Sequence, residues 1–299
     1  MSTVILITIT GLGLGAMYFL VASGLSLIYG LMGVLNFAHG AFITVGAYAS
    51  WWTSAHVFDG VHSVLLRFLL GALVGLLVGG LFAALVELIL IRPLYTRHIE
   101  QVLVTVGLSL AFVALVEGIW GPDQKPYIVP GWLHDTTNVA GAHVPNDRWV
   151  EIATAGLVLV LLQLFLRKTR YGLIIRAGVE NRAMVTALGI DVRKAFTLVF
   201  AVGGVAAAIA GVLSGVYFTV IGADQGVNLL IFAFIVVVIG GLGSIGGSAV
   251  ASVVVALTQQ YTNYYASSGI GDMVVVLLLG VVLLARPRGF AGAIVGGRA

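Results

Sequence analysis

The sequence predicts an all-α polytopic membrane protein with eight or nine membrane segments, and three observations support that prediction. Hydrophobic residues make up 60% of the chain and charged residues only 9%, with a mean hydropathy of +1.10. About a quarter of the residues in a soluble domain are charged, so a soluble fold is excluded. Apolar runs of roughly 20 residues, enough to cross a bilayer, recur along the chain. A polar, glycine-flanked interruption then predicts a broken helix near 30–40.

The first apolar stretch contains no Asp, Glu, Lys or Arg from Val4 to Trp52, and only Asn36 and His39 in it are strongly polar. The segment after this interruption, 37–53, is short, and we expect either a full span or a half-helix there. The whole chain, 1–299, is predicted to form a single transmembrane domain. The other predicted spans are 4–30, 64–91, 100–120, 150–166, 195–221, 226–243, 246–266 and 271–285.

Small residues recur every four positions in two of the predicted spans. Such stripes place glycine or alanine on one helical face, where helices in a membrane approach closely. We therefore predict close helix crossings along Gly71, Gly75 and Gly79, and along Gly203, Ala207, Gly211 and Gly215. A glycine cluster over 240–247 lacks the Lys-Ser/Thr pair of a phosphate-binding loop, and it predicts a tight turn between two spans.

Charge orients the predicted spans. The segment 167–194 holds seven of the fifteen basic residues, and such loops face the cytoplasm. In the segment 121–149 acidic residues offset the basic ones, four prolines stiffen the chain, and Trp132 and Trp149 suit a membrane interface. We predict that this second segment is a periplasmic loop, that the N-terminus lies outside and that the C-terminus lies inside.

Asn36 and His39 are the first candidates for a solute pathway, because an amide and an imidazole form hydrogen bonds without a permanent charge. A structural role is the alternative for both: Asn36 would cap a half-helix, and His39 would bond a neighbouring carbonyl. We expect Thr44, Tyr48, Thr105 and Ser109 to extend a polar lining.

The acidic residues are expected to have structural roles. Glu87 lies five residues before Arg92 and predicts an ion pair at the cytoplasmic interface. Asp224 and Asp272 precede or begin predicted spans, so each is expected to cap a helix N-terminus. A polar patch toward the outer end of the span 246–266 predicts either a gate or a contact with a second membrane subunit; it consists of Gln259, Gln260, Thr262 and Asn263.

Catalytic and metal-binding functions find no support in the sequence. It has no cysteine, and neither a catalytic triad, a pair of carboxylates nor a metal-ligand spacing stands out. Because membrane topology accounts for the basic residues, no nucleic-acid partner is expected. We predict no catalytic residues, no metal site and no cofactor.

Four groups of residues, in order along nearly the whole chain, resemble the permease subunits of branched-chain amino acid ABC importers, specifically the LivH-type half. The resemblance implies that this chain has no ATPase site, that two cytoplasmic ATPase subunits bind the ATP, and that a LivM-like second permease and a periplasmic substrate-binding protein complete an importer in the bacterial inner membrane. The groups are Gly24–Gly30 through Asn36-Phe37-Ala38-His39-Gly40 to Tyr48; Glu87 with Arg92-Pro93-Leu94, Thr105–Ser109 and Trp120-Gly121-Pro122; Arg176-Ala177 with Glu180-Asn181 and Gly189-Ile190; and Gly241–Gly247 with Arg286-Pro287-Arg288-Gly289.

The resemblance also assigns a role to the basic segment 167–194, as the loop that couples the permease to the ATPases. The candidate coupling residues are Arg176, Glu180, Asn181, Arg182 and Gly189. The alternative is a solvated, positively charged loop without a partner.

One position departs from the family pattern. Members that transport amino acids commonly have Glu after the Asn-Phe-Ala-His-Gly motif, whereas this chain has Ala41. Our hypothesis from the sequence is that the loss of this carboxylate favours a neutral or anionic solute. The predicted solute is small and polar or amphipathic: a branched-chain or other amino acid, an amide, urea, or an organic or aromatic acid. An ATP-independent channel or secondary transporter for a small neutral solute remains the alternative function.

Overall fold

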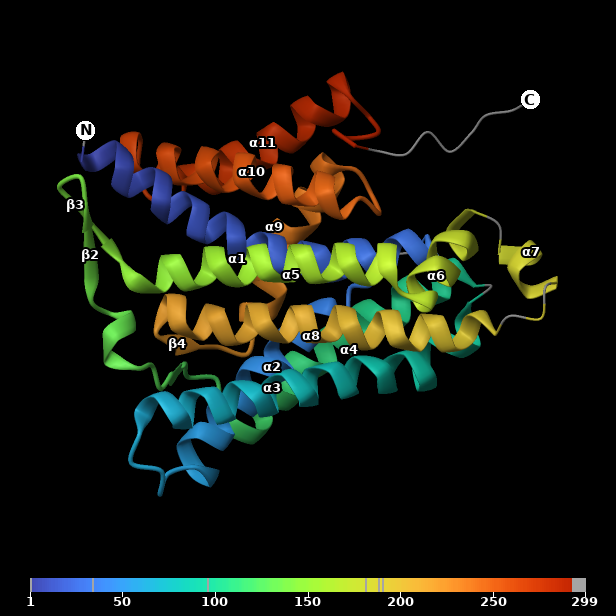
Figure 1. Ribbon diagram of the computed structural model, residues 1–299, viewed down its shortest axis with the longest axis horizontal. Coiled ribbons are helices and arrows are strands. Elements are labelled where there is room, and N and C mark those ends of the chain that lie inside the picture. The colour runs from blue at the N-terminus through green and yellow to red at the C-terminus, as the bar shows by residue number, and fades with distance from the viewer. Residues whose placement is uncertain are drawn as a thin grey trace.

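A computed structural model of the chain describes residues 2–33, 35–95, 97–180, 182–187, 189 and 191–291. Helices dominate this part of the chain, as the sequence predicted (Figure 1). The helices are α1 (Ser2–Met32), α2 (His39–Trp52), α3 (Val64–Val86), α4 (His98–Trp120), α5 (Asn146–Lys168), α6 (Arg170–Glu180), α7 (Arg182–Ala187), α8 (Val192–Phe218), α9 (Gln225–Gly240), α10 (Ile245–Tyr265) and α11 (Ile270–Ala285).

Five of these helices are long and apolar enough to cross a membrane: α1, α3 with its continuation to Leu94, α4, α5 and α8. The number rises to six if α9 and α10, which meet at an angle of 117°, form one bent span. A shorter apolar helix, α11, follows. The described part of the chain therefore supports a multi-pass membrane protein, while the count of eight or nine segments stays a prediction.

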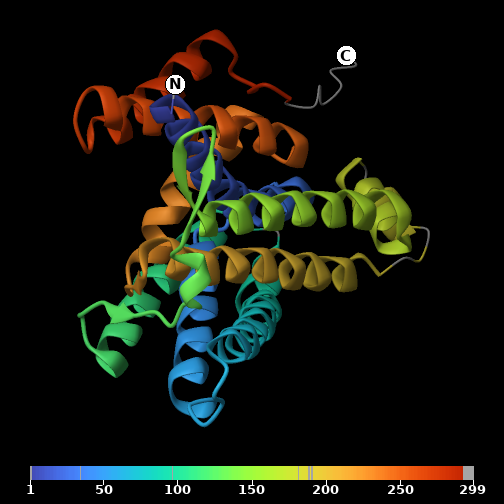
Figure 2. The same ribbon diagram turned by 60° about the vertical axis from the view of Figure 1, so that its left-hand side comes forward.

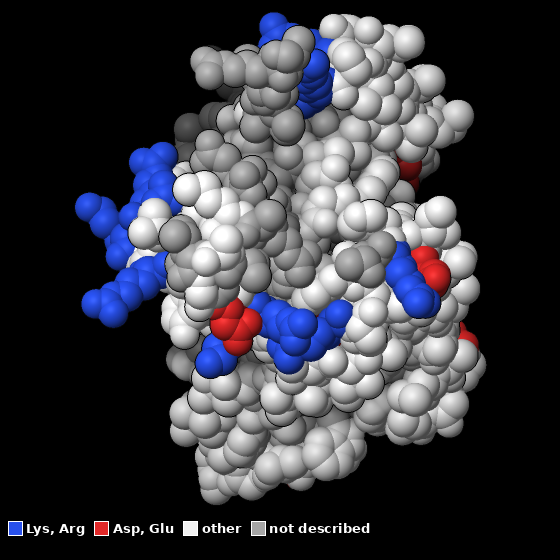
Figure 3. Space-filling view, turned by 90° about the vertical axis from the view of Figure 1, so that its right-hand side faces the viewer, with Lys and Arg blue, Asp and Glu red and all other residues white. Residues whose placement is uncertain are grey.

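The bundle has two different ends. Short strands lie at one end, which we call the strand end: β1 (Lys125–Pro126) pairs with β4 (Val220–Ile221), and β2 (Thr136–Val139) pairs with β3 (Ala142–Pro145), both antiparallel (Figure 1). At the other end lie α6 and α7, and Lys and Arg side chains gather on that face (Figure 3). We call it the basic end. Turned by 60°, the molecule shows the hairpin β2–β3 standing over one side of the bundle (Figure 2).

The predicted break between the first two helices is present. The first helix ends at Met32, Gly33 has a φ of +69°, and α2 begins only at His39. A π-helical segment, Thr53–Val57, continues α2 without a break. At about 1.5 Å per residue, the 14 residues of α2 and the 5 of this segment extend about 28 Å, close to the roughly 30 Å of a hydrocarbon core. The segment 37–53 thus belongs to a helix of nearly full span length that returns toward the strand end (Figure 1).

Glycine stripes hold the centre of the bundle together, where α2 packs between α3 and α8. A Cβ on Gly46 of α2 would lie 2.5 Å from the Cβ of Ala208, and one on Gly75 of α3 would lie 2.5 Å from the carbonyl oxygen of Gly46. A Cβ on Gly79 would lie 2.6 Å from the Cβ of Ala208. These backbones approach too closely for any side chain, so the predicted close crossings are confirmed.

Candidate functional site

At the break, Asn36 lies next to the first turn of α2. Its side chain is buried, and its Oδ1 accepts a hydrogen bond of 3.1 Å from the backbone N–H of Ala38. Its Nδ2 has no hydrogen-bond partner within the described part of the chain. Asn36 therefore satisfies the backbone at the break, and both N–H donors of its Nδ2 remain unpaired among the described residues.

The imidazole of His39 fills a gap between α1 and α2. It is fully buried, its Nε2 lies 3.2 Å from the carbonyl oxygen of Val21, and its ring meets that of Phe42 edge-on at 5.6 Å. A Cβ on Gly24 would lie 2.9 Å from the His39 ring, so the glycine makes room for it. These contacts support the structural role for His39.

Three further candidates on α2 lie in packed helix contacts. Ala41, Thr44 and Tyr48 are all nearly inaccessible, and the Thr44 hydroxyl donates to the carbonyl oxygens of Gly40 (3.3 Å) and Ala223 (3.4 Å). The ring of Tyr48 packs 5.2 Å from that of Trp120. None of these three residues lines the apolar cavity beside Asn36 or the polar cavity at the strand end.

The other two candidates join Asn36 across the bundle. Ser109 on α4 and Asn36 both line an apolar cavity of about 230 Å³, together with residues of α9 such as Val227, Ile231 and Phe234. On the other side of Asn36, Thr105 lines a small void with it. The structure thus brings together Asn36, Thr105 and Ser109 but separates them from the side chains of α2.

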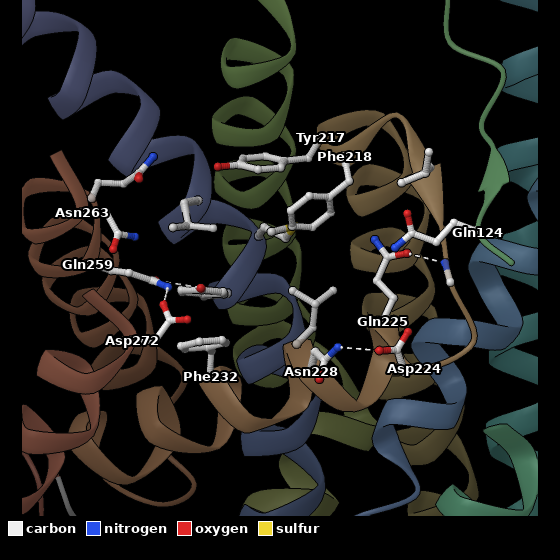
Figure 4. A pocket seen from close by; sticks show the side chains of 17 residues that line it. Gln124, Tyr217, Phe218, Asp224, Gln225, Asn228, Phe232, Gln259, Asn263 and Asp272 are labelled. Atoms are coloured by element: carbon white, nitrogen blue, oxygen red, sulfur yellow. Dashed lines mark hydrogen bonds between the residues drawn. The ribbon is translucent and has the colours of Figure 1, made fainter. Parts of the chain in front are cut away.

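A second and larger cavity, of about 510 Å³, lies at the strand end between α1, α8, α9, α10 and α11 (Figure 4). Its polar lining includes Asp224, Gln225 and Asn228 near the start of α9, and Gln259 and Asp272 on α10 and α11. The sequence predicts helix caps for the acids and a gate or subunit contact for the amides of α10. The structure shows in addition that these residues surround one cavity.

A family model described as the permease component of the branched-chain amino acid transport system matches residues 7–285 of this chain. The chain belongs to this family. It is 28% identical over 287 residues to the high-affinity branched-chain amino acid transport system permease protein LivH of Salmonella typhimurium (94% of this chain, 93% of the relative). It is 29% identical over 289 residues to the corresponding protein BraD of Pseudomonas aeruginosa (95% and 94%). It is 27% identical over 308 residues to the fructose import permease protein FruF of Bifidobacterium longum (96% and 75%). No solved structure matches it significantly.

The LivH-type resemblance predicted from the motifs is therefore confirmed, and the protein is a permease subunit of an ABC importer. In this permease, the cavity at the strand end is larger and more polar than the apolar cavity beside Asn36. We call it the vestibule.

The predicted N-cap position is confirmed for Asp224 and wrong for Asp272. Asp224 is the N-cap residue of α9, but its side chain makes no capping hydrogen bond; instead its Oδ2 accepts from the Asn228 Nδ2 at 3.0 Å. At the start of α11 the N-cap is Gly269, and Asn263 Oδ1 accepts from the N–H groups of Gly269 (3.1 Å) and Gly271 (2.9 Å). Because Asn263 from the neighbouring helix does the capping, Asp272 is not needed for it.

A hydrogen-bonded chain crosses one wall of the vestibule. The Tyr18 hydroxyl donates to Gln259 Oε1 at 2.8 Å, and Gln259 Nε2 donates to Asp272 Oδ1 at 2.6 Å. These two hydrogen bonds fix the orientation of the Gln259 amide and hold Asp272 beside the vestibule (Figure 4).

Behind another wall lies a compact ionic cluster. Arg148 Nη1 lies 3.3 Å from Asp147 Oδ2 and 3.2 Å from Glu151 Oε1, and its guanidinium carbon lies 3.5 Å from the centre of the Tyr217 ring. All three charged side chains are largely buried. The single positive charge is thus offset by two carboxylates, and the cluster adds no net positive charge near the vestibule.

At the basic end the predicted ion pair is confirmed. Glu87 is fully buried and pairs with Arg92 at 3.4 Å. The Thr197 hydroxyl, on α8, donates to Glu87 Oε2 at 2.7 Å, and the Tyr95 hydroxyl donates to Glu87 Oε1. Burial and this hydrogen bond raise the pKa of Tyr95 above its ordinary value. The network joins the end of α3 to the first turns of α8.

The coupling candidates lie in and around α6 and α7. Arg176 on α6 is exposed and borders a hollow beside Gly30 of α1 and Gly243. Gly189 follows α7 with a φ of +78°, a conformation that favours glycine. Glu180 and Arg182 belong to these helices by backbone, but their side chains lie outside the described part of the structure, as does the whole of Asn181.

Proposed function

We propose that this permease pairs with a LivM-like second permease in the bacterial inner membrane and imports a small polar or amphipathic solute. Two cytoplasmic ATPase subunits bind the ATP that drives it, and a periplasmic binding protein delivers the solute at the strand end. This chain itself has no ATPase site and no cofactor. The family supports the assembly, and the basic residues around α6 and α7 support a cytoplasmic orientation for that end. With α2, α9, α10 and α11 counted, the chain enters the membrane in eight or nine segments.

The observation that carries the proposed pathway is that both cavities share α9. Asp224 and Asn228 of this region line the vestibule, whereas Val227 and Ile231 line the apolar cavity that reaches Asn36. From α9, Leu229 and Phe232 also line the vestibule, and Leu230 and Phe234 also line the apolar cavity, so the two cavities lie on opposite faces of the same stretch of α9. A solute would leave the vestibule around the exposed edge of α9 and pass Asn36, Thr105 and Ser109. We assign His39, Ala41, Thr44 and Tyr48 to the support of this route and not to its lining.

One side of α9 is not covered by this chain. Asn228 is exposed, and the side chain of Ile231, one turn further along, is 53% exposed. A partial wall of this kind needs a second subunit to become a closed pathway. The LivM-like permease provides it in our proposal, so the route lies between the two permeases.

For energy coupling we propose that α6 and α7, with Arg176, Glu180, Asn181, Arg182 and Gly189, form the surface on which an ATPase docks. The chain enters α8 directly after this segment, and Thr197 of α8 bonds Glu87 beyond α3. A movement of the docked ATPase would thus reach two membrane helices. If the segment is only a solvated loop, charge reversal at Arg176 will leave ATPase stimulation unchanged.

The test is ATP-dependent uptake by proteoliposomes that contain the complete importer, with leucine, urea and benzoate as the panel. Ile231→Trp should abolish uptake because the larger ring fills the cavity beside Asn36. The matched control is Leu284→Trp on α11, where the native side chain is 90% exposed. Equal uptake by both variants would contradict the pathway. Uptake by this subunit alone without ATP would contradict the importer and favour the channel or secondary transporter.

A further inference from the structure

The vestibule carries negative charge without a matching positive charge. Asp224 and Asp272 line it, and no Lys, Arg or His is among the residues that form its wall. Arg148, behind the Tyr217 ring, is already paired with two carboxylates. A negative potential in a concave space concentrates cations and repels anions.

Each of the two acids is held in place by an amide and retains an oxygen for a ligand. Gln259 donates to Asp272 Oδ1, and Asn228 donates to Asp224 Oδ2. Among the described residues, the second oxygen of each carboxylate accepts no hydrogen bond. Figure 4 shows the two acids on opposite sides of the vestibule, with Phe232 between them. Oriented carboxylates that keep one acceptor each are suited to an ammonium group, which has three donors.

Aromatic rings complete the wall between the acids. Tyr18 and Phe232 both line the vestibule and stack on each other with ring centres 5.1 Å apart and an angle of 10° between the rings. The face of an aromatic ring attracts a cation and also accepts an apolar side chain. The volume of about 510 Å³ lies within the range of small-molecule sites.

We propose that the vestibule is a recognition site in the permease itself for a solute with an ammonium group, which binds to Asp224 or Asp272 while Tyr18 and Phe232 contact its apolar part. The inference rests on the proposed function, since it places the site on the solute's route. It revises the hypothesis drawn from Ala41. The carboxylates that bind the amine come from the N-cap of α9 and from α11, so the lack of a carboxylate at position 41 does not make the pathway neutral. Simple organic anions are excluded from this route.

The first test measures the charge selectivity of the vestibule and needs neither transport nor the binding protein. The chain has no native cysteine, so Gln260→Cys places a single thiol in the vestibule wall. In the assembled importer we expect a cationic methanethiosulfonate to modify it faster than an anionic one. Asp224→Asn and Asp272→Asn should each slow the cationic reagent by about fivefold, the effect of one unit charge about 4 Å away in water, and speed the anionic reagent by about the same factor. The rate ratio should therefore fall by about 25-fold. Asp135→Asn, an exposed acid at the same end, is the control.

The second test identifies the ligand. Leucinamide and leucine should slow the modification of the thiol, whereas 4-methylpentanoate, which lacks the amine, should not. Gln124→Cys, on the opposite wall, repeats the measurement if Gln260→Cys disturbs assembly.

Three results would overturn the proposal. The first is a rate ratio that neither Asn variant changes, and the second is equal protection of the thiol by 4-methylpentanoate. The third is protection by the binding protein alone, which would mean that the acids bind an ammonium group of that protein and not one of the solute. Failure of the native importer to take up any solute with ATP would contradict the proposed function instead, while the labelling ratio would still report on the vestibule.

Discussion

Replacing Glu87 is the most direct test of the packing at the basic end. This carboxylate is fully buried and is the acceptor for Arg92, Thr197 and Tyr95. Glu87→Ala removes that acceptor from all three donors. Removing one partner of a buried ion pair costs about 3–5 kcal/mol. The Arg92 side chain is 33% exposed and can recover water, so we expect about 2–3 kcal/mol here.

That loss corresponds to a fall of about 3–5 °C in melting temperature for a chain of this size. Glu87→Gln keeps an acceptor oxygen for the two hydroxyls and loses only the charge, so its melting temperature should fall by about half as much. The measurement is the thermal stability of the purified permease in detergent, followed by size-exclusion chromatography after heating.

The control for this series is Glu100→Ala. Glu100 pairs with Arg97 at 3.1 Å, but the two side chains are 51% and 63% exposed, so their pair contributes little. We expect its melting temperature to match that of the native protein within about 2 °C. If Glu87→Ala behaves like Glu100→Ala, the buried network does not stabilise the bundle and the reasoning is refuted.

Two further predictions concern the packing of α2. Gly46→Ala would place a Cβ 2.5 Å from that of Ala208, and overpacking of this kind should cost about 1–3 kcal/mol, measured by the same thermal assay; Gly60→Ala, with no heavy atom within 4 Å, should have no effect. Tyr127→Phe removes its 2.6 Å hydrogen bond to Ser50 and should cost about 1 kcal/mol. Burial raises the pKa of Tyr127 above 10, so the unfolded chain ionises first and stability should fall as the pH rises above about 10; Tyr127→Phe should weaken that fall, and an unchanged pH profile would contradict it.

The helices were predictable because the solvent imposes them. A backbone in hydrocarbon must satisfy its own hydrogen bonds, so every long apolar run had to become a helix. The break was predictable for the same reason, since Asn36 and His39 interrupt an uncharged stretch. The ion pair of Glu87 with Arg92 was a local pairing, five residues apart, and could be predicted from spacing alone.

The vestibule could not be predicted in this way, because its residues come from segments far apart in the sequence. Asp272 begins a helix and is a typical N-cap, but Asn263 from α10 already accepts from the N–H groups there. Only the fold shows that a residue of another helix has taken over the cap. The patch on α10 was noticed as polar, yet nothing in its spacing indicates that it faces α9.

The same reasoning explains why one position was a poor guide to the solute. A carboxylate influences a passing charge through its distance from the route, and its place in a motif does not determine that distance. Ala41 is buried in helix contacts, whereas Asp224 and Asp272 lie on a cavity at the end where we propose that solute arrives. The charge preference of this permease should therefore follow the net charge of the vestibule wall. A relative with Glu after its Asn-Phe-Ala-His-Gly motif but with neutral residues at these two places is expected to show weaker cation selectivity in the thiol-labelling test, despite its more typical motif.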